Sequence, residues 1–170
     1  QKNFVKGTIV TSNGEMIEGY INYRETTKSF ATVEFKKNKE EKKSQTYTVS
    51  DLKSFEISGL EKYTKYICKV SMDYRDLSSL SRGIDSTFKT DTLFLRELSS
   101  GRYLTLLSYQ DKIKNRFYML NANDIIPQEL IYKVYLDPNN ASDFIIESHQ
   151  FRNQLKQSAE LHNTATVAVI

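Results

Sequence analysis

Alternating apolar and polar residues in the first two thirds of the chain predict β-strands. The segments 4–11 and 16–23 flank an Asn-Gly dipeptide at 13–14, which tolerates positive φ angles and is typical of a type I′ hairpin turn. In the second segment Ile17 and Ile21 share one face, because successive side chains of a strand point to opposite sides. We therefore expect a β-hairpin with one buried face at the start of the chain.

Several later segments also have strand character. We expect strands at 32–36, 46–49, 55–58, 63–72, 92–98, 102–109 and 116–120. The last three predict an antiparallel meander, although 93–98 also fits a short helix. Two polar stretches lie between strands: 36–43 is expected to be a solvated loop, and 73–91 a long, turn-rich loop. Long irregular loops in compact domains are often functional.

The periodicity changes after Asn123 and predicts helices. Pro127 suits the first turn of a helix, and apolar residues then recur at helical spacing: Leu130, Ile131, Val134 and Tyr135. Ser142 is the expected N-cap of a second helix, whose apolar stripe consists of Phe144, Phe151, Leu155 and Ala159. The last segment, 164–170, has a β-like composition and is expected to form a terminal strand.

These elements predict an α+β fold that is mainly β. We expect a bent antiparallel sheet or a partly open barrel with C-terminal helices, and several strand orders fit the same alternation. A chain of 170 residues with 39% apolar residues fits one folded domain, and it contains no Pro- or Gly-rich linker. We therefore expect a single domain over 1–170, with a β-rich portion (1–122), a helical portion (123–163) and the terminal strand.

Charge and cysteine content narrow the function classes. The 24 basic and 21 acidic residues leave a net charge of +3, spread along the chain rather than gathered in the basic stripe of a nucleic-acid binder. Cys68 is the single cysteine, so no intrachain disulfide can form. The apolar runs are far shorter than the ~20 residues of a membrane-spanning helix. Gln1 at the start fits an exported protein whose signal peptide has been removed, and equally a shortened chain.

Residues that usually carry catalysis are few and isolated. His149 and His162 lie in the predicted second helix at a separation of about 20 Å, too far apart to bind one metal ion. Cys68 lies in a strand pattern and is expected to be a small core residue rather than a nucleophile. The glycines form no phosphate-binding run, and no Gly-x-Ser-x-Gly occurs. We therefore assign no catalytic, cofactor-binding or metal-binding residue and expect no enzyme.

Two groups of charged residues leave alternatives open. The long loop carries four acids: Asp73, Asp76, Asp85 and Asp91. A hydrolase of the glycosidase type would need two such carboxylates within ~5–10 Å. The loop at 36–43 carries five lysines: Lys36, Lys37, Lys39, Lys42 and Lys43. These could contact phosphates, although the loop also contains two glutamates and lacks aromatic residues for base stacking. A glycosylation sequon at Asn140 indicates an exposed loop.

The opening segment resembles the start of a group of exported proteins of Bacteroidetes bacteria for which no activity is known. In that group a hairpin of the form G-x-I-V-T-x-x-G-(D/E)-x-I-x-G-x-I-x-Y-R follows a signal peptide, and residues 7–24 have this form. Two further patches, 94–101 and 151–155, resemble the same group. The resemblance implies export and a β-rich fold, and it transfers no activity and no site residue. The hairpin also resembles the first strands of Sm-like and SH3-like small barrels.

Elimination and this resemblance together favour a non-catalytic binding or protein-interaction domain of the bacterial periplasm or cell envelope. Its partner would be an unknown envelope protein or a second copy, associated through exposed sheet edges and the final strand. The first alternative is a small-barrel nucleic-acid-binding module that uses the five lysines. The second is a carboxylate-dependent hydrolase that uses the acids of the long loop.

Overall fold

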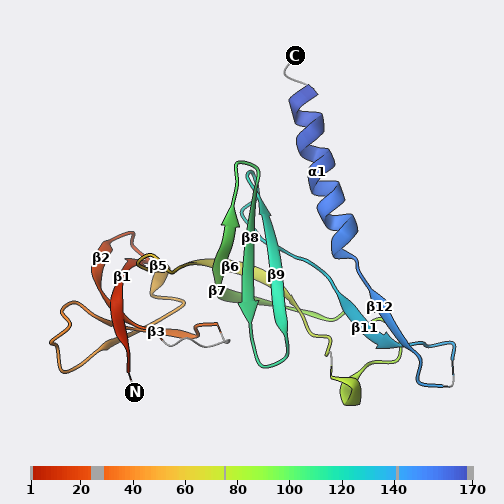
Figure 1. Ribbon diagram of the computed structural model, residues 1–170, viewed down its shortest axis with the longest axis horizontal. Helices are drawn as coiled ribbons and strands as arrows, with labels where there is room; N and C mark the ends of the chain where they lie inside the picture. Colours follow the sequence, from red (N-terminus) through yellow and green to blue (C-terminus); the bar gives the residue numbers. More distant parts are fainter. Residues whose placement is uncertain (1, 24–28, 75, 141, 168–170) are drawn as a thin grey trace.

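The computed structural model describes residues 2–23, 29–74, 76–140 and 142–167, with side chains described as far as Glu160. The structure is mainly β, with 52% strand and 9% helix, which confirms the predicted class. Figure 1 shows an elongated molecule, with the N-terminal strands at one end, an upright meander in the middle, and a two-stranded ribbon with one helix at the other end.

Ten strands form one open antiparallel sheet. Two further strands form a separate pair. In chain order the twelve strands of the described residues are β1 (Phe4–Thr11), β2 (Met16–Asn22), β3 (Thr32–Lys36), β4 (Gln45–Thr48), β5 (Leu52–Ile57), β6 (Glu61–Ser71), β7 (Phe88–Ser100), β8 (Leu104–Gln110), β9 (Asn115–Asn121), β10 (Gln128–Glu129), β11 (Lys133–Leu136) and β12 (Ile145–Ser148). The order in the large sheet is β10-β9-β8-β7-β6-β5-β1-β2-β3-β4, and β11 pairs with β12 alone. The sheet does not close into a barrel, so the bent-sheet form of the prediction is the correct one.

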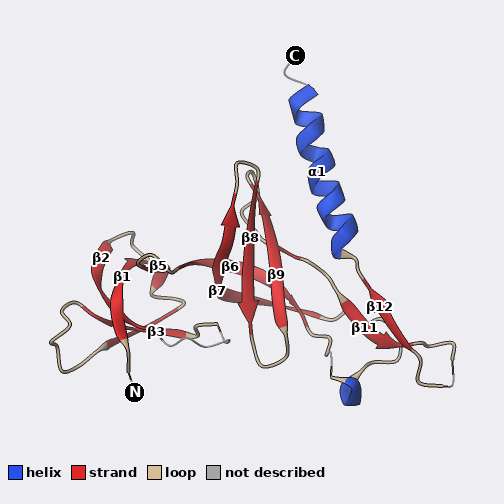
Figure 2. Ribbon diagram, viewed as in Figure 1, coloured by secondary structure: helices blue, strands red, loops and turns tan. Residues whose placement is uncertain are grey.

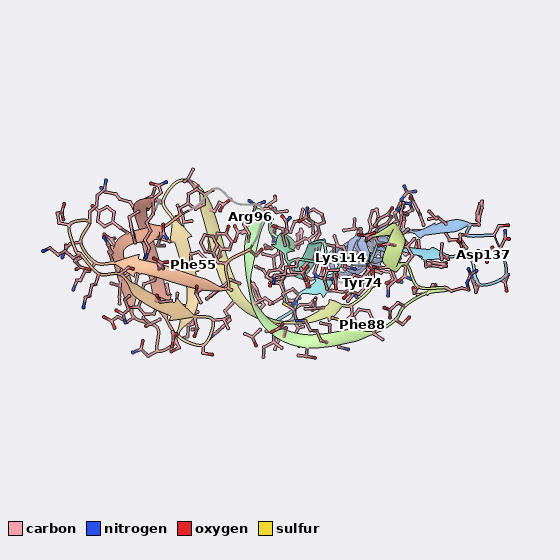
Figure 3. All side chains as sticks on the ribbon, turned by 90° about the horizontal axis from the view of Figure 1, so that it is seen from below. Phe55, Tyr74, Phe88, Arg96, Lys114 and Asp137 are labelled. Carbon is pink, nitrogen blue, oxygen red and sulfur yellow. The ribbon has the colours of Figure 1, made fainter. Side chains whose placement is uncertain are left out.

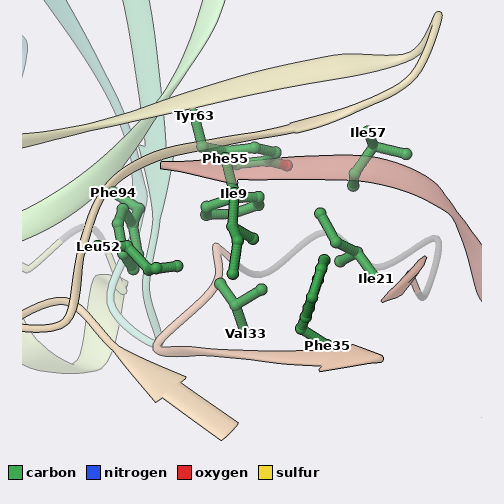
Figure 4. Close-up of a cluster of buried hydrophobic side chains, with 9 residues drawn as sticks. All are labelled: Ile9, Ile21, Val33, Phe35, Leu52, Phe55, Ile57, Tyr63 and Phe94. Carbon is green, nitrogen blue, oxygen red and sulfur yellow. The ribbon is translucent and has the colours of Figure 1, made fainter. Parts of the chain in front are cut away.

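An apolar core fills the N-terminal end of the molecule (Figure 4). Its buried residues are Ile9, Ile21, Val33, Phe35, Leu52, Phe55, Ile57, Tyr63 and Phe94. The ring of Phe55 stacks on Tyr63 with 4.6 Å between centroids, and Phe94 meets Phe55 edge-on at 5.1 Å. These are the two geometries that ring quadrupoles favour. The face of β2 that the alternation of Ile17 and Ile21 predicted to be buried therefore packs in this core.

A second apolar core lies on the opposite face of the sheet. It contains Cys68, Val70, Leu93, Leu95, Leu107 and Tyr118. Phe94 belongs to the first core while its neighbours Leu93 and Leu95 belong to the second, because adjacent strand residues point to opposite faces. The long strands β6 and β7 thus contribute to both cores and make the two halves of the molecule one continuous sheet.

The opening hairpin is confirmed, but its turn differs from the type I′ prediction. Gly14 has φ = 94°, whereas no other residue type in the described ranges has positive φ, so Asn13 is not in the left-handed region. A type I′ turn needs positive φ at both central residues. Here Gly14 N–H donates to the carbonyl oxygen of Thr11 at 2.9 Å, and only the glycine adopts the left-handed conformation.

The middle of the chain follows the prediction closely. The strands expected at 32–36, 46–49, 55–58 and 63–72 correspond to β3–β6, and those at 92–98, 102–109 and 116–120 form the meander β7-β8-β9. The strand form of 92–98 is correct and the helical form is wrong. The long loop is shorter than predicted, since β7 already begins at Phe88; one 3-10 turn, η1 (Leu77–Ser79), interrupts it.

The C-terminal prediction is confirmed for one of its two helices, whereas the first helix, the start of the second at Ser142 and a strand at 164–167 are wrong. Figure 2 shows strands and turns where residues 123–150 were expected to be mostly helical. Ser142 caps no helix; the described chain contains one long helix, α1 (Phe151–Val167). Residues 164–167 lie in this helix and not in a strand, and 168–170 lie outside the described residues. The short apolar run at 130–135 fits a buried strand as well as a helix. It forms the strand β11 because it pairs with β12.

Candidate functional site

The strands β11 and β12 form a ribbon that leaves one backbone edge unpaired. Their register pairs Lys133 with Ser148 and Leu136 with Ile145. The far side of β11 contacts the chain through a parallel bridge between Arg82 and Leu136. In the described part of the chain no strand pairs with the outer edge of β12. A free edge presents a row of N–H and C=O groups that a further strand can pair with.

Apolar and acidic side chains accompany this edge. Phe144 is 61% exposed and Ile145 is 41% exposed, at the start of β12. Glu147 in the middle of the strand and Asp143 just before it have exposed carboxylates. A strand that paired here would meet apolar groups and negative charge.

Arg82 attaches the long loop to the turn of the ribbon. Its guanidinium donates to the carbonyl oxygens of Asp137 at 3.2 Å and Asn140 at 2.8 Å, and to the carboxylate of Asp143 at 2.9 Å. Because Arg82 and Asp143 are both exposed, the ion pair itself contributes little. The carbonyl contacts instead connect the long loop to the turn, in which Asp137 N–H donates to the carbonyl oxygen of Phe144 at 2.8 Å.

Lys133 attaches the base of the ribbon to the body of the protein. Its side chain is 3% exposed, lies over the ring of Phe88 at 5.2 Å from the centroid, and donates to the carbonyl oxygen of Asp85. Its ammonium also lies 3.8 Å from Oδ1 of Asp73, and the other oxygen of that carboxylate accepts from Lys114 at 2.7 Å. Figure 3 shows Lys114 between Phe55 at one end of the molecule and Asp137 at the other.

A fully buried arginine completes this cluster of charges. Arg116 of β9 donates to the carbonyl oxygen of Ser71 at 2.7 Å, to Glu129 of β10 at 3.1 Å and to Asp111 at 3.0 Å. Glu129 in turn accepts from the backbone N–H and the hydroxyl of Ser71, each at 2.8 Å. We call Asp73, Asp111, Lys114, Arg116, Glu129 and Lys133 the buried ionic cluster; its three carboxylates balance its three cations.

The pKa shifts in this cluster reflect burial and hydrogen bonding. Burial lowers the pKa of Lys114, since removal of water disfavours the ammonium more than Asp73 stabilises it. Burial alone would raise the pKa of Asp111, but the N–H groups of Lys114 and Ile113 and the guanidinium of Arg116 donate to it and hold its pKa below the usual range. Most of these groups already contact one another, so the cluster fits an anchor better than a reaction centre.

The four acids of the long loop have separate local partners. Asp73 is buried against Lys114, whereas Asp76 accepts from Ser78 and Asp85 accepts from Thr87. Asp91 lies in β7 and pairs with Lys89 at 2.8 Å. The structure thus gives each acid a structural contact and does not show them converging on one site.

The lysines of the 36–43 loop lie in different surroundings. The ammonium of Lys36 lies over the ring of Phe4 at 4.5 Å. Glu41 accepts from the backbone N–H groups of Lys37 and Asn38, so a carboxylate lies within the turn itself. The expected solvated loop is confirmed, since residues 37–43 are exposed.

The remaining candidate residues have ordinary structural positions. Cys68 is buried in the second core, as predicted, and burial raises the pKa of its thiol to about 12. His149 precedes α1 instead of lying inside it and contacts the rings of Tyr132 and Phe151; the side chain of His162 lies outside the described ones. Asn140 is exposed. The described residues contain no group of three or more His, Cys, Asp or Glu placed to hold a metal ion.

Sequence reasoning missed the buried ionic cluster. One signal was present. Arg116 lies on the same face of its predicted strand as Tyr118 and Leu120, and strict alternation of buried and exposed positions makes this the buried face. A charged residue at a core position predicts a buried partner. Lys133 gave no such signal, because its segment was interpreted as a helix.

No family model matches the chain, and comparisons with curated proteins and with solved structures found no similar protein. Among the described helices, none combines the length and apolar character needed to cross a membrane.

Proposed function

We propose that this chain is a non-catalytic protein-interaction domain of the bacterial cell envelope, which binds an extended segment of a partner protein along β12. One observation carries the proposal: the outer edge of β12 is unpaired in the described chain and has Phe144 and Ile145 exposed beside it. Such edges recruit strands, since backbone hydrogen bonds supply affinity and alternate side chains supply specificity.

Charge complementarity indicates the chemistry of the partner. Glu147 presents an exposed carboxylate in the middle of β12, and Asp143, although paired with Arg82 at 2.9 Å, keeps an exposed carboxylate just before the strand, so a partner segment with alternating apolar and basic residues fits this edge. The rest of the ribbon supports this role: Lys133 and Arg82 hold the strand in place before any partner arrives. The envelope location rests on the resemblance of the opening hairpin to exported proteins.

Site-specific crosslinking in the source bacterium tests the proposal. A photo-reactive phenylalanine analogue is placed at Ile145 of the full-length protein, and in parallel at Met16, which is 70% exposed on the opposite end. We expect position 145 to give one discrete adduct in the envelope fraction and position 16 to give none. Asp143→Lys together with Glu147→Lys should abolish that adduct by reversing the charge of the edge.

Equal adducts from both positions, or none from either, would overturn the proposal. Recovery of the native protein from the cytosol would also contradict it. In that case salt-dependent binding to nucleic acid becomes the next assay, because neutralised phosphates make affinity fall steeply with salt.

A further inference from the structure

A polar hollow on the N-terminal end of the molecule is separate from the ribbon and takes no part in the proposed function. It is lined by Lys6, Gly7, Thr8, Glu18, Gly19, Tyr20, Lys37, Asn38 and Ser58. The register of β1 and β2 pairs Lys6 with Tyr20 and Thr8 with Glu18, so these four side chains share one face of the hairpin.

Two facing glycines bring neighbouring strands close to this hairpin. Gly7 pairs with Gly19, and a Cβ atom on Gly7 would lie 2.6 Å from the carbonyl oxygen of Glu56 and 2.7 Å from Cδ1 of Ile21. A Cβ atom on Gly19 would overlap the carbonyl oxygen of Lys36. The chain after Lys36 is thereby held against β2, where Lys37 and Asn38 form one rim of the hollow.

The rim is kept in shape by a carboxylate that does not line the hollow. Glu41 accepts from the N–H groups of Lys37 and Asn38, each at 3.3 Å. The ion pairs of the described structure do not include the ammonium of Lys37 or Lys6 or the carboxylate of Glu18. The hollow therefore presents unpaired charges of both signs beside the half-buried ring of Tyr20.

This combination of groups matches an acidic sugar. Two ammonium groups against one carboxylate favour a ligand with a negative charge, since charge-assisted hydrogen bonds are the strong ones. A simple anion would leave Glu18 facing like charge, whereas a sugar hydroxyl can donate to that carboxylate. Thr8, Ser58 and Asn38 offer further hydroxyl and amide groups. Tyr20 provides an aromatic face on which the C–H groups of a sugar ring can pack.

We propose that this hollow binds a hexose ring that carries a carboxylate or a phosphate. Lys6 and Lys37 would contact the acidic group, and Glu18 would accept from a ring hydroxyl. The hollow is more polar than most ligand sites, which suits a sugar with many hydroxyl groups better than an apolar ligand.

Titration of the isotope-labelled full chain by NMR tests this assignment, with the amide signals of Gly7 and Gly19 as reporters. The probes are glucuronate, glucose 1-phosphate, glucose and inorganic phosphate. We expect glucuronate or glucose 1-phosphate to shift both signals, and whichever binds more tightly identifies the acidic group. Glucose and inorganic phosphate should each bind about tenfold more weakly, because each lacks half of the required chemistry.

Substitution of lysines inside and outside the hollow distinguishes binding in the hollow from attraction of an anion to the charged surface in general. Lys6→Met with Lys37→Met should raise the Kd of the tighter acidic sugar about tenfold, whereas Lys39→Met with Lys43→Met, in the same loop but outside the hollow, should leave it within about twofold. All four lysines are exposed, so the fold should survive in both variants.

Equal losses in the two lysine pairs, binding of inorganic phosphate as tight as that of the acidic sugars, or no shift with any probe would each overturn the assignment. None of these outcomes bears on the crosslink at position 145. The two proposals therefore fail separately.

Discussion

The two ends of this molecule are stabilised by different physics. At the N-terminal end, rings and branched aliphatic side chains pack around Phe55. The polar groups buried there are neutral: the Tyr63 hydroxyl donates to Glu61 at 2.6 Å, and the Asn22 amide oxygen accepts from the Asn3 N–H at 2.9 Å. At the base of the C-terminal ribbon, the ionic cluster around Arg116 and Lys114 places five charged side chains out of contact with solvent and a sixth, Asp111, at its partly exposed margin. An apolar core accepts replacements that keep its volume and apolar character, whereas a buried charge requires each of its partners.

Loss of Arg116 should therefore have the largest effect of any single substitution considered. Arg116→Ala leaves Glu129 and Asp111 without their cation in a buried site, and we expect a loss of about 3–5 kcal/mol in the free energy of unfolding. Urea denaturation followed by circular dichroism measures it. The matched control is Arg96→Ala, whose half-exposed ion pair with Glu61 should be worth less than about 1 kcal/mol. Equal losses in the two variants would mean that burial of the cluster is unimportant.

Truncation of Phe55 should be nearly as costly, for a different reason. Phe55 is 1% exposed and contacts Tyr63, Phe94 and Phe30. Phe55→Ala creates a cavity, and we expect a loss of about 3–4 kcal/mol by the same urea assay. Phe55→Leu, which retains much of the volume, should cost clearly less.

The two ends should then respond differently to conservative replacement. Phe55→Leu preserves packing in part, whereas Arg116→Lys keeps the charge but loses the fork that contacts Glu129 and Asp111 together. We expect Arg116→Lys to recover little of the stability lost in Arg116→Ala. Full recovery would show that charge alone, and not geometry, stabilises the C-terminal end.

The same contrast explains how far the sequence predicted the fold. Strands at the N-terminal end follow a strict alternation, so Ile17, Ile21 and the β3 segment could be placed from pattern alone. The ribbon could not, because the run from Leu130 to Tyr135 fits helical spacing, and its strand form depends on pairing with β12. The type of the turn at Asn13 was predicted wrongly, because an Asn-Gly dipeptide fits more than one turn type.

The candidate sites were less predictable than the fold. Buried partners such as Asp73 and Lys114 are 41 residues apart in sequence, and nothing local connects them. The free edge of β12 follows from strand order, which alternation does not specify. The hollow depends on the register of Gly7 with Gly19, which the hairpin prediction implies only once the turn length is known.

Substitution of Gly19 tests how tightly the N-terminal end is packed. Gly19→Ala would bring a methyl group into the carbonyl oxygen of Lys36 and the ring of Phe35. Overpacking of this kind costs about 1–3 kcal/mol, measurable as a lower thermal midpoint. Gly101→Ala is the control, because its nearest neighbour would lie at an ordinary contact distance of 3.4 Å. If the two variants have the same thermal midpoint, the close approach of β3 to the hairpin does not limit the side chain at position 19.

The smallest expected effect concerns Cys68, which lies in the core between the two ends. Burial raises the pKa of this thiol to about 12. At a pH above the usual pKa of a cysteine thiol, the unfolded chain therefore loses the proton while the folded chain keeps it. A group with a raised folded pKa contributes stability below the unfolded pKa and loses it as pH rises, so about 1.5 kcal/mol of the free energy of unfolding should disappear between pH 8 and pH 10. Cys68→Ala should lack this part of the alkaline slope, while all other titrations remain. Urea midpoints of both proteins across that range measure the difference, and parallel slopes would show that the thiol ionises without unfolding. Since Cys68 lies in neither the aromatic core nor the ionic cluster, this slope measures the contribution of one buried thiol in the second core to the free energy of unfolding of the whole sheet.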